Sequence, residues 1–296
     1  MYTNIRHWVV ALLVCIVVWG IGTAPILAQS SGGSSAEDTK QKLEQLKKNY
    51  ATFQKAGKQN NYETAYSSLA DAVRLAEATD QSNALSKLRN FQQKLPTKWG
   101  NKALKAERYE QARTHFEKGI EWSPDDTYVY YGKGLALVNM DSTAAAMEAM
   151  TKAIEIGNEN GDVRTASLAT DRIRQEFIAK ASKALSAETP TAADVEEALS
   201  HLDEMKQYVD PSAKSLFYRA TALYEKEQYK SAIATAQQGL ERLQEGSRTD
   251  RAKYHFIVAE SQMKLGNKTS ACETFGKAAF GDHKARSEHY LENECK

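Results

Sequence analysis

The sequence has few of the residues that interrupt helices. It contains 5 prolines and 16 glycines among 296 residues, and alanine, leucine, lysine, glutamate and glutamine dominate its body. Good helix formers with few turn residues do not make a β-sandwich, so the composition favours an all-helical fold. The 42% of hydrophobic residues are enough to build a folded core rather than a disordered chain.

The sequence also has no excess of positive or negative residues. The formal net charge is +1 at pH 7, and it falls to about zero without Arg6, the only Lys, Arg, Asp or Glu among the first 28 residues. A neutral body has no basic surface for nucleic acid or for an anionic membrane. We therefore expect neither as a partner of the body.

Catalytic motifs are absent from the sequence. No Gly-x-Ser-x-Gly, glycine-rich phosphate loop or His-Glu-x-x-His occurs, and the histidines of the body are scattered. Nucleophilic catalysis needs a nucleophile, a base and an orienting acid in one place, so we expect no enzyme and no cofactor. The scattered histidines are His115, His201, His255, His283 and His289.

Cysteine is scarce, with Cys15 in an N-terminal apolar segment and Cys272 and Cys295 near the C-terminus. In an oxidising compartment the last two favour a disulfide worth about 3 kcal/mol, and a pair of free thiols is the alternative. No metal is expected, because the polar residues around them follow no zinc-binding spacing. Those residues are His283, Glu288, His289 and Glu292.

The N-terminus has the pattern of a secretory signal peptide. Residues 8–21 form an apolar run after Arg6, and Ala28 supplies the small residue before a cleavage site. The run is shorter than the ~20 residues of a comfortable membrane span. We therefore expect a signal peptide over 1–28, a Ser/Gly-rich flexible linker over 29–36 and an exported, periplasmic protein, with an uncleaved anchor as the alternative.

A period of 34 residues runs through the body. Residues 93–126 carry Trp99-Gly100, Tyr109, Ala112, Phe116, Gly119 and Pro124, and residues 127–160 carry Tyr130, Gly134, Leu137, Ala146, Met150 and Ala153. In order and spacing these residues resemble the tetratricopeptide repeat. The resemblance implies an all-α solenoid of about five to six helical hairpins, wound as a right-handed superhelix.

Two further units continue the pattern at 213–246 and 252–285, and a weaker unit lies at 46–79. Residues 161–211 are too long for one repeat and predict a degenerate hairpin, with helices near 163–187 and 194–208 around Pro190. The expected organisation is N-terminal repeat-like helices over 37–92, two repeats over 93–160, a degenerate repeat over 161–212, and two C-terminal repeats with a capping helix over 213–296.

Small and bulky residues alternate in the way that stacked hairpins require. We expect small residues to let paired helices approach and bulky ones to fill the gap to the next pair. The small set is Ala112, Ala146, Ala232 and Ala271, and the bulky set is Phe116, Met150 and Phe275.

The resemblance also implies a concave groove lined by the first helix of each pair. Aromatic residues at its non-packing positions predict the binding of an extended or helical peptide. If the degenerate segment 161–211 covered the groove, that surface would be lost. The predicted lining is Tyr128, Tyr131, Leu135, Asn139, Lys214, Phe217, Thr221, Tyr224, Lys253, Phe256, Glu260 and Met263.

These features predict a non-catalytic scaffold or adaptor of the bacterial envelope that binds a protein or peptide in its groove. The alternative is a structural subunit of an envelope complex that is tethered to the membrane by an uncleaved N-terminus.

Overall fold

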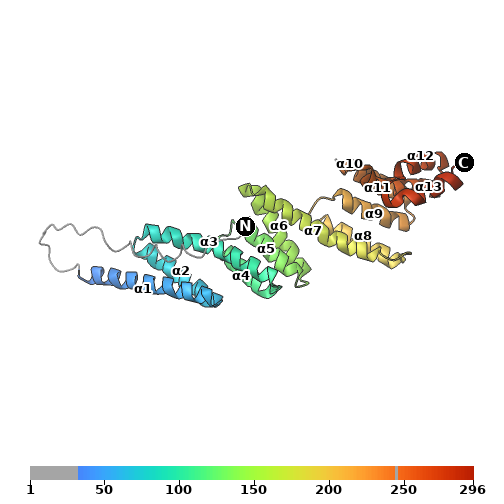
Figure 1. Cartoon of the computed structure of the whole chain (residues 1–296). Helices are drawn as coiled ribbons and strands as arrows, with labels where there is room; N and C mark the ends of the chain where they lie inside the picture. The colour runs from blue at the N-terminus through green and yellow to red at the C-terminus, as the bar shows by residue number, and fades with distance from the viewer. Residues whose placement is uncertain (1–32, 244–245) are drawn as a thin grey trace, which may run out of the picture. The chain divides into compact units, whose positions relative to one another are not determined.

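A computed structural model describes residues 33–243 and 246–296. The predicted signal peptide and the first four residues of the predicted linker lie outside these ranges. Within them the chain forms thirteen α-helices, one short 3-10 helix and no strand (Figure 1). The all-helical class predicted from the sequence is confirmed.

The described residues divide between Leu88 and Arg89 into two compact units. The first contains the hairpin of α1 (Gly33–Lys58) and α2 (Tyr62–Ala78). Helix α1 begins inside the segment 29–36 predicted as a linker. Along α2, apolar and small side chains recur at three and four positions, and Ala65, Leu69 and Ala72 are fully buried.

Helix α3 (Ser82–Lys105) begins in the first unit and ends in the second, so the predicted boundary at 92/93 lies inside one helix that continues through Pro96. The remaining helices follow in hairpins and end with a single helix. They are α4 (Tyr109–Trp122), α5 (Thr127–Val138), α6 (Thr143–Asn160), α7 (Val163–Ala184), α8 (Ala192–Met205), α9 (Ala213–Glu225), α10 (Tyr229–Arg242), α11 (Arg248–Lys264), α12 (Lys268–Ala278), η1 (Gly281–His283) and α13 (Lys284–Asn293).

The turns inside the hairpins share one backbone geometry. A residue with positive φ ends the first helix, and the next N–H donates to a carbonyl five residues earlier, as from Arg108 to Ala103 and from Ser142 to Leu137. This pattern satisfies carbonyls that a helix end leaves free. The α7–α8 connection, which contains Pro190, lacks a positive-φ residue and is longer. In the turns of these hairpins, the residues with positive φ are Asn60, Glu107, Asp141, Glu227 and Gly266.

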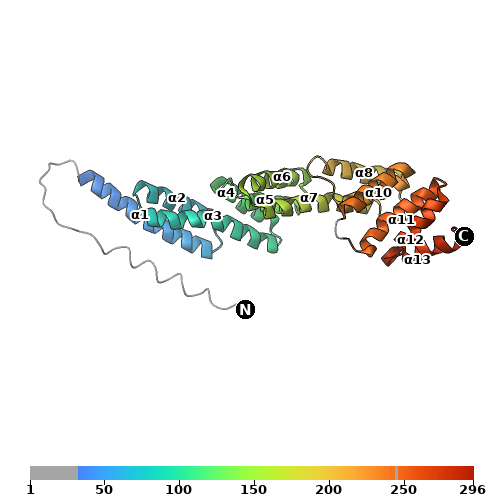
Figure 2. The same ribbon diagram turned by 90° about the horizontal axis from the view of Figure 1, so that it is seen from above.

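Consecutive helices of the second unit pack against each other from α4 to α13, which is the arrangement of a helical repeat solenoid (Figures 1 and 2). The predicted small and bulky packing residues are all fully buried. Phe116 of α4 illustrates their fit, because its ring lies against Gly100 of α3 and Gly132 of α5. A side chain at either glycine would occupy the space of the ring.

This fit can be tested at Gly132. A methyl group there would overlap Phe116, and overpacking costs about 1–3 kcal/mol, more than the roughly 1 kcal/mol that alanine gains over glycine in a helix. We expect Gly132→Ala to lower the free energy of unfolding, measured by urea denaturation.

Gly276 of α12 is the matched control, because a Cβ there would meet nothing within 4 Å. Gly276→Ala should raise the free energy of unfolding by up to about 1 kcal/mol. Equal effects at the two glycines would contradict the proposed fit.

Candidate functional site

Helices α5, α7, α9 and α11 form a continuous wall. Besides their hairpin partners, α5 contacts α7, α7 contacts α9, and α9 contacts α11. Side chains on the free face of these helices are therefore neighbours although they lie far apart in sequence. The segment 161–211 does not cover this wall, because its first helix, α7, is part of it.

The α5 residues predicted to line a groove differ in exposure and in their contacts. Tyr128, Tyr131 and Leu135 are half-buried and Asn139 is exposed. The Tyr128 hydroxyl donates to Asn101 Oδ1 of α3 at 3.2 Å, and its ring meets the Tyr131 ring edge-on at 5.8 Å. Asn139 instead turns back to donate to the Leu135 carbonyl at 2.8 Å, so it caps its own helix.

The predicted α9 residues Phe217, Thr221 and Tyr224 are half-buried. Phe217 meets Tyr254 of α11 edge-on at 5.6 Å, and the Lys253 ammonium lies 4.9 Å from the centre of the Phe217 ring. The Thr221 hydroxyl donates to the Phe217 carbonyl. Phe217 thus joins two neighbouring helices and offers only part of its surface to a partner.

The prediction that Phe256 and Glu260 of α11 line an open groove is wrong. They are only 3% and 8% exposed, because the C-terminal segment covers them. Arg286 of α13 lies 4.5 Å from the Phe256 ring centre and pairs with Glu260 at 2.9 Å, and the Tyr290 hydroxyl donates to Glu260 at 3.3 Å. The C-terminal segment therefore covers the face of α11 that would otherwise continue the wall.

A disulfide joins this cap to the last hairpin. Cys272 of α12 is bonded to Cys295, which follows α13, with their Cα atoms 5.7 Å apart. The Tyr290 ring also stacks on Phe275 of α12 at 4.3 Å. Covalent and apolar contacts together hold α13 in place.

Burial raises the pKa of the Glu260 carboxyl, and the nearby Glu225 of α9 adds to the rise. Arg286, the Tyr290 hydroxyl and Lys264 act in the opposite direction. Burial also raises the pKa of Tyr224 on α9, with Glu260 the next contributor. The charged carboxylate is therefore a costly group that the Arg286 pair partly compensates.

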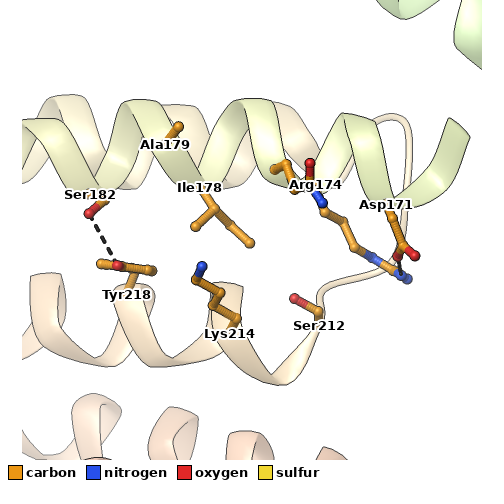
Figure 3. Close-up of a pocket in the computed structure, with 9 residues that line it drawn as sticks. Asp171, Arg174, Ile178, Ala179, Ser182, Ser212, Lys214 and Tyr218 are labelled. Atoms are coloured by element: carbon orange, nitrogen blue, oxygen red, sulfur yellow. Dashed lines mark hydrogen bonds and ion pairs between the residues drawn. The ribbon is translucent and has the colours of Figure 1, made fainter. Parts of the chain in front are cut away.

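A hollow of about 420 Å³ opens on the wall between α7 and α9 (Figure 3). The Ser182 hydroxyl donates to the Tyr218 hydroxyl at 3.1 Å, while Arg174 pairs with Asp171 at 3.2 Å and donates to the Asp210 carbonyl at 3.0 Å. Its lining consists of Asp171, Arg174, Gln175, Ile178, Ala179, Ser182, Ser212, Lys214 and Tyr218.

Sequence reasoning had placed only Lys214 of this lining on the inner wall. The α7 residues of the lining were not predicted, because the degenerate segment could not be aligned with the repeat. The spacing of three and four between Asp171, Arg174, Ile178 and Ser182 could have identified one common face of the helix.

Among the described residues, no group of His, Cys, Asp or Glu is arranged to hold a metal ion. Across the same ranges, no helix has the length and apolar character required to cross a bilayer.

The cap gives a pH-dependent prediction. Because the Glu260 carboxyl has a raised pKa in the folded state, the folded chain holds a proton that the unfolded chain has already lost, and stability falls as pH rises through that window. Glu260→Gln mimics the protonated form. The free energy of unfolding of this variant, compared with that of wild type, should therefore increase from about pH 4 to pH 7. Urea denaturation at several pH values measures it.

Glu273 of α12 is exposed and serves as the matched control. Glu273→Gln should stay within about 0.5 kcal/mol of wild type at each pH. A Glu260→Gln curve parallel to wild type would contradict the assigned burial.

Comparison with protein families matches residues 127–160 to a tetratricopeptide repeat. These residues are the α5–α6 hairpin from its first helical residue to its last. No curated protein sequence matches the chain. Among solved structures, NprR in complex with its cognate peptide NprX is similar over 88% of this chain and 83% of that chain, with 16% identity and a TM-score of 0.31. Residues 127–160 therefore form a tetratricopeptide repeat, and further helical hairpins stack on either side of it.

Proposed function

We propose that the protein is a non-catalytic scaffold that binds a protein or peptide segment along the wall of α5, α7 and α9. The observation that carries the proposal is the hollow between α7 and α9, beside which α5 and α9 carry half-buried aromatic side chains. Rigid aromatic rings offer large contact area at low entropic cost. Stacked repeats commonly bind partners on such extended surfaces.

The proposed binding face excludes the last hairpin, whose wall residues Phe256 and Glu260 are covered by α13. The open part of the wall therefore runs over α5, α7 and α9. A segment bound there would contact Tyr131, Gln175 and Lys214 in turn.

Crosslinking with a photoreactive amino acid tests this assignment. Gln175 is exposed on the wall, and Glu148 is exposed on α6, a second helix of its hairpin. In the cells of origin, the probe at Gln175 should form a discrete adduct that the probe at Glu148 does not. Adducts at both positions alike, or at neither, would exclude the wall as the binding face.

We also propose that the protein acts outside the cytoplasm. The signal-peptide pattern before Gln29 supports export, and the Cys272–Cys295 disulfide suits an oxidising compartment. The competing proposal is a subunit tethered to the membrane by an uncleaved N-terminus.

N-terminal sequencing of the native protein separates the two proposals. Cleavage should give a chain that begins at Gln29, which leaves no apolar segment to act as an anchor. A chain that retains residues 8–21 would support the tethered subunit instead.

A further inference from the structure

The charges around the hollow between α7 and α9 are unevenly compensated. Arg174 is paired with Asp171 and also bound to the Asp210 carbonyl, so this cation is already neutralised. Across the described ranges, Lys214 has no ion-pair partner, and it is exposed. Figure 3 shows its ammonium reaching from α9 toward Ile178 of α7.

The remaining lining has no carboxylate to offer this ammonium. Ile178 is buried, and the Ser182 and Tyr218 hydroxyls are bonded to each other. Asp171 is the single acidic lining residue, and Arg174 already holds it. The hollow thus presents one uncompensated positive charge beside apolar and hydroxyl groups.

Aromatic surface continues next to the hollow on the same face of α9. Phe217 adjoins Tyr218, with ring centres 5.3 Å apart, and carries the Lys253 ammonium of α11 at 4.9 Å. The Lys253 ammonium lies over the Phe217 ring, so this apolar surface has a positive charge beside it. This surface complements a segment that carries both a carboxylate and apolar side chains.

We propose that the hollow between α7 and α9 takes an acidic side chain of an extended protein segment, with Lys214 as its counterion and Ile178 and Tyr218 as its apolar walls. The inference rests on the proposed function and adds the chemistry of the partner to it. Charge complementarity selects partners more strongly than it adds affinity, so Lys214 acts mainly as a determinant of specificity.

Selection from a random decapeptide library against the full-length chain tests the partner chemistry. Peptides that bind wild type should be enriched in Asp and Glu over the starting library. Lys214→Glu should abolish that enrichment, because it places a negative charge in the hollow. Lys230→Glu is the matched control, since Lys230 is an exposed lysine of α10 away from the lining, and enrichment should persist.

Affinity measurements on one selected peptide complete the test. Lys214→Glu should weaken its binding by at least about tenfold, and Lys214→Met by about two- to fivefold, as expected for one partly exposed ion pair. Replacing its Asp and Glu by Asn and Gln should cause a loss comparable to that of Lys214→Met and should abolish the effect of Lys214→Met. Circular dichroism of each variant checks that the fold is retained.

The outcomes separate this inference from the proposed function. Selected peptides without acidic enrichment, or acidic peptides insensitive to Lys214→Glu, would overturn the inference, while a specific adduct at Gln175 would keep the wall as a binding face. A library that yields no binder also overturns the inference. If the probe at Gln175 also formed no specific adduct, the proposed function would be excluded.

Discussion

Hairpins of the second unit stay together because a bulky side chain of one helix lies where its neighbours have almost no side chain. Phe116 of α4 lies against Gly100 of α3 and against Gly132 of α5, which belongs to the next hairpin. Inside the α5–α6 hairpin, Met150 would likewise be only 2.6 Å from a Cβ at Gly134. A single hairpin cannot bury such a ring, so its apolar area is removed from water only when the next hairpin is present. The close packing of these groups also leaves little room for rearrangement.

This mode of stacking separates the residues that hold the fold from those that meet a partner. Helices α5, α7 and α9 each contact their hairpin partner and the preceding hairpin, and each leaves another face on the wall. Asp171, Gln175 and Lys214 contribute little to the core, so their chemistry can vary without loss of the fold. Fold and binding chemistry are therefore largely independent in this protein.

The end of the stack obeys a different constraint. The last hairpin has no successor, and α13 covers the apolar Phe256 that would otherwise face water. That cover also buries the Glu260 carboxylate, which Arg286 and Tyr290 then compensate. The cap thus closes the wall at the final repeat, and the disulfide between Cys272 and Cys295 holds the cap in place.

The sequence by itself determined the helical class, the hairpins and the residues that nest between them, because these depend on local spacing: Ala112 and Phe116 occupy the buried positions that their register predicts. Of the residues that line the hollow, it identified only Lys214. It could not place the α7 side of the hollow or foresee the burial of Phe256 and Glu260. Those features depend on which helices become neighbours in space and on where the C-terminal helix comes to lie, and contacts between distant segments leave no periodic pattern in the chain.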